Sequence, residues 1–405
     1  MKRIIVSIAV ALTMATLSVP AFATNGDNVF GVGTMSRSMG GVGAAAPQDA
    51  ITAVFGNPAA MCYIPCETSE VDFAATIFDP TITTTVTSPG GTRKATSQGA
   101  PYAFPAIGIY TPINDNWRFG LAAYGVSGMG VDYKDSDLPS VMGAGADLKT
   151  DFQAMKFAPN IAYKILPNLS VGAALQLNWA QLDLGQGSAH NFGVGTQIGV
   201  SYKPLDGLSL GLTYQSPQKH TFKRVYDFNG DGSHDRLALE QPQQVVLGVA
   251  YDIIPNKLLM ELDGKWINWA NATGYEDFGW RDQYVVALGA QYKALDWLTF
   301  RAGYNYGNNP VKESNGWNGA ATVDMQGTPI SRTFVEYFKV VGFPAIVEHH
   351  ISVGMGVKIS PKVSMNVGYS HAFSKTISET DSTGTFKFES KLAESSYEVG
   401  LNIMF

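Results

Sequence analysis

One stretch of the sequence carries the residue types of a calcium-binding loop. Oxygen-bearing side chains stand at its first, third, fifth and ninth positions, as Asp227, Asn229, Asp231 and Asp235. Ca²⁺ prefers such oxygen ligands, and a glycine at the sixth position (Gly232) permits a sharp turn. The twelfth position lacks the glutamate of an EF-hand. The sequence indicates either a calcium site that stiffens a loop or a plain hairpin tip with Asn-Gly and Asp-Gly turns.

The other reactive residue types form no recognisable catalytic centre. Cys62 and Cys66 are the only cysteines, and after export this close pair could form a disulfide, with free or lipid-linked thiols as the alternative. Ser370 and His371 are adjacent, so on a strand they point to opposite faces and cannot share a hydrolase site. We expect no enzymatic activity and no required cofactor; Ca²⁺ is a candidate ligand of the loop described above.

The sequence is dominated by predicted strands, and the last nine residues show the alternation of side chains that is typical of them. Apolar side chains from Tyr397 to Phe405 alternate with polar or small ones from Ser396 to Asn402. A strand with an apolar face outward and a polar face inward is typical of a barrel wall in lipid. A closed barrel leaves no unpaired sheet edge in hydrocarbon.

The first 23 residues have the composition of a secretory signal. Lys2 and Arg3 precede a short apolar run, which ends in an Ala-x-Ala sequence at Ala21 and Ala23. We expect residues 1–23 to be removed on export. Together with the terminal strand, they place the protein in the outer membrane of a Gram-negative bacterium, with both termini in the periplasm.

From residue 67 to residue 405, short turns alternate with strands of period two. Six tight turns contain Asn, Asp, Gly or Pro, at 114–116, 167–168, 206–207, 255–256, 295–296 and 361–362. Seven longer connections lie between them, at 84–100, 126–150, 184–190, 217–236, 270–280, 307–345 and 375–389. Thirteen connections join fourteen strands. The sequence therefore predicts an all-β fold, a 14-stranded antiparallel transmembrane β-barrel.

Some charged residues fall on the inward face of the predicted strands. They are Glu261, Asp263, Lys265 and Arg301. We expect a salt-bridge network that maintains the barrel shape, with ligand contact as the alternative. The net charge of −6 gives no indication of nucleic-acid binding.

Residues 24–66 lack the alternation of the barrel. Glycines interrupt a run of small residues, and the apolar residues Ile51, Val54, Phe55 and Met61 argue against a disordered tail. A wide barrel without a plug would leave an aqueous hole through the membrane. We therefore expect this segment to form a small N-terminal hatch inside the barrel.

The chain resembles the FadL/TodX family of outer-membrane transporters for long-chain fatty acids and other hydrophobic compounds. The resemblance covers nearly all of the mature chain. It rests on motifs at 36–43 (Ser-Arg-Ser-Met-Gly-Gly-Val-Gly), 49–50, 57–59, 111–115, 212–216, 301–304 and 310–311, and on the terminal Phe405.

The resemblance implies a hatch with an Asn-Pro-Ala motif, here Asn57, Pro58 and Ala59. It also implies a kink in the third strand, through which a hydrophobic ligand leaves sideways into the bilayer. The kink maps onto 124–130, with Tyr124, Gly125, Gly128 and Gly130. Closely spaced glycines favour a bulge; a strand that simply ends in a flexible loop is the alternative.

The site of first capture departs from the family pattern, because the connection 184–190 is short where the family type member has a large loop. The connections 126–150 and 307–345 are the candidates for this role. Phe334 and Phe338 lie in an apolar cluster of the second, which suggests contact with a greasy ligand or lipopolysaccharide; self-packing of the loop is the alternative. Arg281 is a candidate lumen partner for a carboxylate, with a surface charge as the alternative.

These patterns favour a passive uptake channel for hydrophobic molecules, either long-chain fatty acids or aromatic hydrocarbons, with lateral release. A general porin for small polar solutes and a structural or adhesive barrel are the alternatives. The expected partners are the hydrophobic ligand, outer-membrane lipid and lipopolysaccharide. We expect a monomer that binds no nucleic acid.

Overall fold

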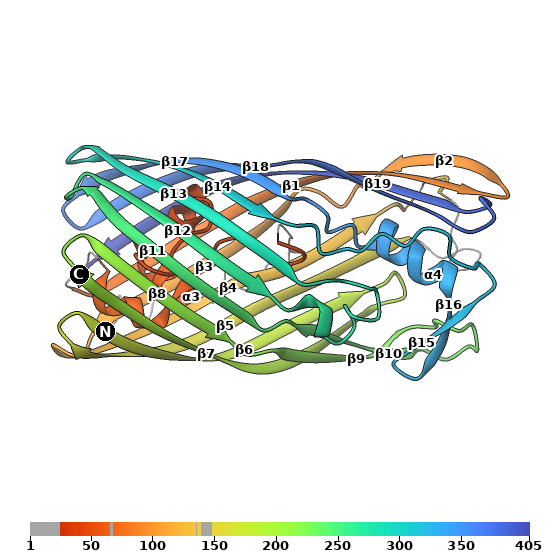
Figure 1. Cartoon of the computed structure of the whole chain (residues 1–405), viewed down its shortest axis with the longest axis horizontal. Coiled ribbons are helices and arrows are strands. Elements are labelled where there is room, and N and C mark those ends of the chain that lie inside the picture. Colours follow the sequence, from red (N-terminus) through yellow and green to blue (C-terminus); the bar gives the residue numbers. More distant parts are fainter. Residues whose placement is uncertain (1–24, 65–67, 135, 139–147) are drawn as a thin grey trace.

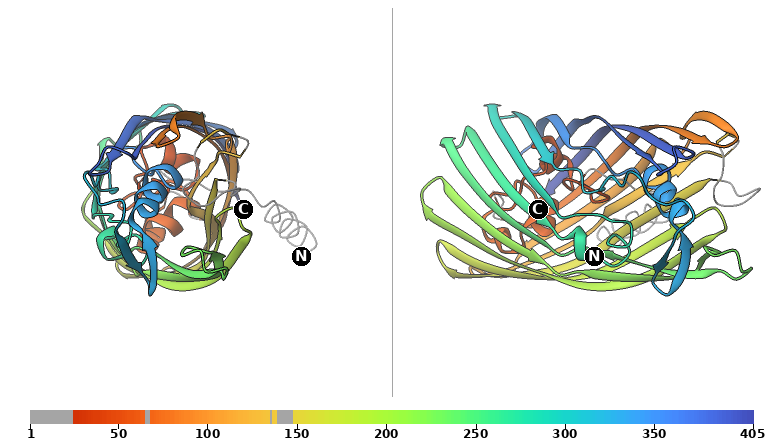
Figure 2. Two further views of the ribbon diagram at one scale, coloured as in Figure 1. Left: turned by 90° about the vertical axis from the view of Figure 1, so that its right-hand side faces the viewer. Right: turned by 45° about the vertical axis from the view of Figure 1, so that its right-hand side comes forward.

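The last strand, β19 (Lys387–Met404), shows how sequence alternation forms the wall. Tyr397 and Val399 are 54% and 45% exposed, whereas Ser396 and Glu398 on the opposite face are 3% and 4% exposed. This computed structural model describes residues 25–64, 68–134, 136–138 and 148–405. In it, β19 pairs with β18 on one side and with β1 on the other. That last pairing closes a barrel in which every wall strand is antiparallel to its neighbours (Figures 1 and 2).

Fourteen strands form the wall, as the sequence predicts. In order they are β1 (Glu70–Ser88), β3 (Tyr102–Pro112), β4 (Trp117–Asp132), β5 (Lys149–Leu166), β6 (Leu169–Asp183), β7 (Ser188–Leu205), β8 (Leu208–Gln215), β11 (Gln244–Ile254), β12 (Leu258–Ile267), β13 (Gln283–Leu295), β14 (Leu298–Gly307), β17 (His349–Ser360), β18 (Val363–Thr380) and β19. The exposed face of the wall is largely apolar.

The barrel has a tight-turn end and a long-loop end (Figure 1). The long loops carry the added strands β2 (Gly91–Thr96), β9 (Gln218–Tyr226), β10 (Asp235–Gln241), β15 (Thr322–Met325) and β16 (Thr328–Ser331), and the short helices η2 (Trp269–Asn271), α4 (Arg332–Tyr337) and η3 (Phe338–Gly342). Among the described residues, no helix combines the length and apolar character that crossing a membrane requires.

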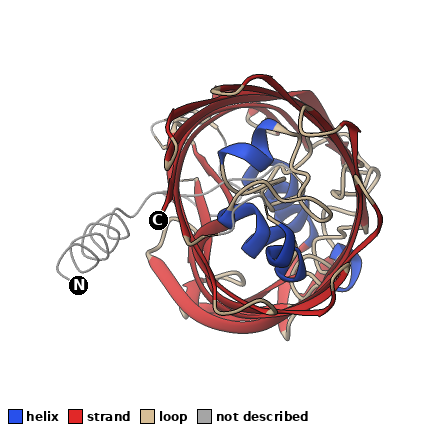
Figure 3. Cartoon of the chain, turned by 90° about the vertical axis from the view of Figure 1, so that its left-hand side faces the viewer, coloured by secondary structure: helices blue, strands red, loops and turns tan. Residues whose placement is uncertain are grey.

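The segment 25–64, which we call the hatch segment, lies inside the ring of strands (Figure 3). It contains α2 (Thr34–Ser38), α3 (Ala50–Gly56) and the 3₁₀-helix η1 (Pro58–Tyr63). Asp49 caps α3 by accepting a hydrogen bond from the Thr52 amide at 2.7 Å. Almost all of the segment is buried, with Ile51 only 1% exposed and Val54 fully buried.

Carboxylates of the inner wall bind the backbone of the hatch segment. Asp263 accepts hydrogen bonds from the amides of Gly43 and Ala44 at 3.0 and 3.1 Å, and Glu261 accepts one from Ala45 at 2.7 Å. The predicted salt-bridge network is wrong, because Glu261, Asp263, Lys265 and Arg301 form no ion pair among the described residues. The two acidic side chains instead satisfy amides that would otherwise be buried without partners.

Glycines of the wall leave room for the hatch segment. A Cβ atom added at Gly211 would lie 1.8 Å from the carbonyl oxygen of Ala44, and one at Gly303 would lie 2.0 Å from the amide nitrogen of Gly40. The hatch backbone therefore contacts the wall backbone directly at these positions.

A buried cluster of charges fastens the helical part of the longest loop at the long-loop end. Lys339 on η3 forms ion pairs with Glu336 on α4 and, at 2.7 Å, with Glu379 near the end of β18. All three side chains are at most 1% exposed. This cluster ties α4 and η3 to the wall.

Candidate functional site

An internal cavity separates part of the hatch segment from the wall. It has a volume of about 50 Å³, and its apolar lining residues include Val29, Phe55 and Val126. Lys156 on β5 and Lys265 on β12 also line it, and we therefore call it the lysine cavity. Most of its other lining residues are polar, among them Gln197, Gln215 and Gln241. The positive charge suits the acidic end of a ligand, and the few apolar residues suit the part next to it.

Lys156 is the more deeply buried of the two lysines, at 3% exposed. Its ammonium group donates hydrogen bonds to the side-chain oxygens of Gln215 at 3.0 Å and Gln176 at 3.3 Å. Neither lysine forms an ion pair within the described part of the chain. Asp263 also lines the cavity. Its Oδ2 atom accepts hydrogen bonds from the hatch backbone, and its charge acts on Lys265, so Lys156 is the lysine without an acidic neighbour in the lining. A cation without a paired anion in a buried site attracts an anionic ligand group.

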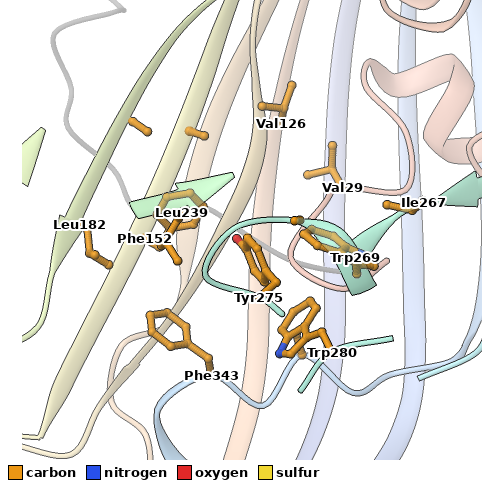
Figure 4. Close-up of a cluster of buried hydrophobic side chains, with 14 of the residues drawn as sticks. Val29, Val126, Phe152, Leu182, Leu239, Ile267, Trp269, Tyr275, Trp280 and Phe343 are labelled. Carbon is orange, nitrogen blue, oxygen red and sulfur yellow. The ribbon is translucent and has the colours of Figure 1, made fainter. Parts of the chain in front are cut away.

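A second, apolar cavity of about 20 Å³, the outer cavity, lies among residues of β5, β10 and the long loops. Its lining includes Phe152, Tyr275, Trp280 and Phe338. Figure 4 shows Phe152, Tyr275 and Trp280 in the same buried cluster as Val29 and Val126 of the lysine cavity. One buried cluster of apolar side chains therefore lies between and around the two cavities.

The wall itself is interrupted between β3 and β4. The pairing of these strands ends at Ala106 and Tyr124, and a bulge between Gly125 and Ser127 shifts the register of β4 against β5. At its far end, β4 is bonded again to the chain that precedes β3, because the carbonyl of Asp132 accepts a hydrogen bond from the Gln98 amide. We call the unpaired stretch the wall gap. The predicted kink region therefore remains part of strand β4, but it is not paired with β3.

The hatch segment pairs with β4 in the wall gap. The Val29 amide donates to the carbonyl of Val126 at 3.0 Å, and the Gly128 amide donates to the carbonyl of Asp27 at 3.0 Å. The free edge of β4 is thereby satisfied by hatch backbone rather than by β3. Movement of the chain near Asp27 would uncover this edge.

The Asn-Pro-Ala motif attaches the hatch segment to the wall. The side-chain amide of Asn57 donates to the carbonyls of Ala44 at 2.7 Å and Val200 at 3.0 Å, and its oxygen accepts from Ala59 at 3.0 Å. Pro58 begins η1, where its missing amide hydrogen costs no hydrogen bond. The motif thus has a structural role in this chain.

The structure places the predicted ligand contacts differently from the sequence-based expectation. Arg281 is exposed and bonds to the carbonyl of Asn309 at 2.9 Å, so it does not face the lumen. Phe334 and Phe338 are buried, at 6% and 1% exposed, so they form no exposed patch. Phe338 lines the outer cavity, whereas Phe334 packs on Tyr226 and Phe228. The alternative expectation, that the apolar residues of this loop pack on one another and on neighbouring loops, describes this cluster.

The loop 227–235 has its acidic oxygens turned toward its own backbone. Asp227 accepts hydrogen bonds from the amides of Gly230, Asp231 and Gly232, and Asp235 accepts one from Phe228. No group of three acidic, histidine or cysteine residues in the described part of the chain is arranged to hold a metal ion. Calcium binding at Asp227, Asn229, Asp231 and Asp235 stays a prediction.

Two further predictions fall on residues outside the described part of the chain. Cys62 is buried, but Cys66 lies outside the described residues, so the disulfide stays a prediction. The signal at 1–23 also lies outside them.

The family model of the outer membrane protein transport proteins (OMPP1/FadL/TodX) matches residues 10–191 and 182–317. The chain therefore belongs to this family, and it is an outer-membrane protein. It is 24% identical to a 47 kDa outer membrane protein of Pasteurella multocida over 98% of this chain and 97% of the relative. It is 23% identical to the long-chain fatty acid transport protein of Escherichia coli, over 78% of this chain and 85% of the relative.

Solved structures of similar proteins share the fold. The toluene transporter TodX of Pseudomonas putida matches with a TM-score of 0.67 at 19% identity, over 94% of this chain and all of the other. A FadL homologue of Pseudomonas aeruginosa matches with a TM-score of 0.70 at 17% identity, over 96% and 99% of the two chains. These likenesses independently support the fourteen-stranded barrel.

Proposed function

We propose that the protein is a passive outer-membrane uptake channel for hydrophobic molecules. The ligand enters from the long-loop end, passes through the outer cavity into the lysine cavity, and leaves sideways through the wall gap. The hatch segment closes the direct route along the barrel axis. The observation that carries this proposal is the interruption of β3–β4 pairing at Tyr124 in a barrel whose other seams are paired.

The lateral route agrees with the energetics of a hydrophobic ligand. Transfer into the bilayer recovers about 25 cal/mol for each Å² of apolar surface removed from water. Partition down a gradient therefore suffices, and no nucleotide hydrolysis is needed.

Between the two expected ligand classes, the lysine cavity favours long-chain fatty acids. Relatives are described as a long-chain fatty acid transport protein and as a toluene transporter. Lys156 and Lys265 offer positive charge to a carboxylate, a feature that a neutral aromatic hydrocarbon does not use. The buried hatch segment argues against a general porin, and cavities inside the barrel argue against a purely structural role.

The test separates binding from release by removing the bulge. Deletion of Val126, the extra residue of β4, would restore regular pairing with β5 and is intended to bring β4 back beside β3. Val126 also lines the lysine cavity and binds the Val29 amide, so retained binding of dodecanoate is the check that the cavity is intact. Val126→Ala keeps the bulge and is the matched control. We expect the deletion to abolish uptake of dodecanoate into a Gram-negative host that lacks its own fatty acid channel, while the purified protein still binds dodecanoate.

Normal uptake by the deletion variant would contradict lateral release. Liposome swelling in small sugars by the wild-type protein would instead favour the porin.

A further inference from the structure

A third cavity lies on the lumen side of the wall gap. It has a volume of about 30 Å³, and both edges of the gap contribute to it, with Tyr102 on β3 and Met129 on β4. Ala345, in the long loop after η3, lies on its other side. All lining side chains are apolar except those of Tyr102 and Glu394. A ligand that leaves through the gap must therefore pass these two groups.

Glu394 on β19 is a carboxyl group without a counter-cation. It is 3% exposed, and its Oε2 atom has no hydrogen-bond partner among the described residues. The nearby cation is Arg37, but the guanidinium of Arg37 is bound to Glu398 at 2.9 Å and to Ser396 at 2.9 Å. A buried polar atom without a protein partner is left to a water molecule, an ion or a ligand, and Glu394 holds such an atom where the cavity meets the wall gap.

We propose that Glu394 shares a proton with the carboxyl group of a departing fatty acid, so that the ligand enters the hydrocarbon uncharged. This inference rests on the proposed function. Two carboxyl groups in one buried site cannot both ionise, because like charges at short range repel strongly. A fatty acid that moves from the lysine cavity to Glu394 therefore forms a pair that holds one proton.

The proton balance of the step is complete. The proton of the Glu394 carboxyl moves to the carboxylate of the ligand, which leaves as the neutral acid. Glu394 is then a carboxylate, and water in the lumen returns the proton. An ionised carboxylate is strongly disfavoured in hydrocarbon, so the neutral form is the one that can cross the gap. Glu394 thus distinguishes acids from neutral ligands at the exit.

The test compares a fatty acid with the corresponding alcohol. Uptake of dodecanoate and of dodecanol is measured in a host that lacks its own fatty acid channel, for the wild-type protein, Glu394→Gln and Glu394→Asp. Glutamine keeps the size and hydrogen bonding of the side chain but cannot supply a proton. At about pH 7.5 we expect Glu394→Gln to lower dodecanoate uptake by roughly tenfold or more and to leave dodecanol uptake unchanged. Glu394→Asp should restore dodecanoate uptake in part.

The pH dependence provides a second readout that a purely structural defect would not change in this way. The deficit of Glu394→Gln should shrink as the pH falls toward the ordinary pKa of a carboxylic acid, because the ligand then takes its proton from water. An equal ratio of acid to alcohol uptake in the wild-type and Gln proteins would overturn the inference. If the wild-type protein admits neither compound, the proposed function fails, and this inference fails with it.

Discussion

Arg37 of the hatch segment and Glu398 of the last strand form an ion pair at 2.9 Å in which both side chains are at most 1% exposed. The pair joins residues that are 361 positions apart in the sequence. It fixes α2 beside the seam where β19 and β1 close the barrel. Arg37 also donates to the carbonyl of Gly31 and to Ser396.

Arg37→Met should loosen the hatch segment, because it leaves Glu398 buried without its partner. Loss of one member of a buried ion pair costs about 3–5 kcal/mol. We expect faster proteolysis of residues 25–64 and a larger ion conductance in planar bilayers. Lys293→Met, which breaks the exposed pair with Asp296, is the control and should cost at most about 1 kcal/mol. Equal behaviour of the two variants would contradict the role of Arg37.

Gly211→Ala should displace the hatch segment without any change of charge. The new Cβ atom would overlap the Ala44 carbonyl at 1.8 Å, whereas the atom nearest to a Cβ at Gly264 is 4.0 Å away. Overpacking of this kind costs about 1–3 kcal/mol. Gly264→Ala is therefore the matched control, and conductance should rise only in Gly211→Ala.

Lys156→Met should weaken the binding of dodecanoate but not of toluene. The lost interaction is a hydrogen bond to a charged group, worth about 1.5–3 kcal/mol, which corresponds to roughly 10- to 100-fold in Kd. Calorimetry with the purified protein in detergent measures both affinities. A parallel loss for both ligands would indicate a damaged cavity rather than a lost charge contact.

The cluster of Glu336, Lys339 and Glu379 should make the loop helices sensitive to pH. Burial is the largest cause and raises the pKa of Glu379 from 4.5 to about 8; Lys339 lowers this pKa, and the nearby Glu336 raises it. When α4 and η3 are packed against the wall, Glu379 therefore keeps its proton up to about pH 8; when this packing is lost, Glu379 releases the proton at its ordinary pKa. Its stability is therefore greatest below about pH 4.5 and decreases as the pH rises toward 8.

Hydrogen exchange of residues 332–342 measures this effect. Exchange should speed up between pH 5 and pH 8 beyond its intrinsic dependence on pH. Glu379→Gln should remove the additional acceleration. An unchanged slope in this variant would show that Glu379 does not titrate in this range.

Local patterns in the sequence were sufficient to predict the barrel. The alternation in β19 predicts its inward and outward faces, and the six tight turns with seven longer connections give the number of strands. The location of the bulge follows from Gly125, Gly128 and Gly130, which weaken strand pairing. These features depend on neighbours in the chain, so the sequence contains them directly.

Contacts across the lumen could not be predicted in the same way. Lys156 and Glu394 are single inward residues on long strands, and only barrel closure shows that they line cavities. Glu261 and Asp263 were expected to pair with basic residues, but they bind hatch amides that the sequence does not place near them. For Arg281 the strand-start pattern allows both a lumen contact and a surface charge, and the structure shows the exposed position.

The close fit between wall glycines and hatch backbone has a consequence for chimeric proteins. Ala44 and Gly40 occupy recesses that exist only because Gly211 and Gly303 lack side chains. A hatch segment transplanted from a distant relative would enter a barrel whose inner wall fits a different backbone path. Such an exchange should succeed only when the matching recesses are transplanted together with it.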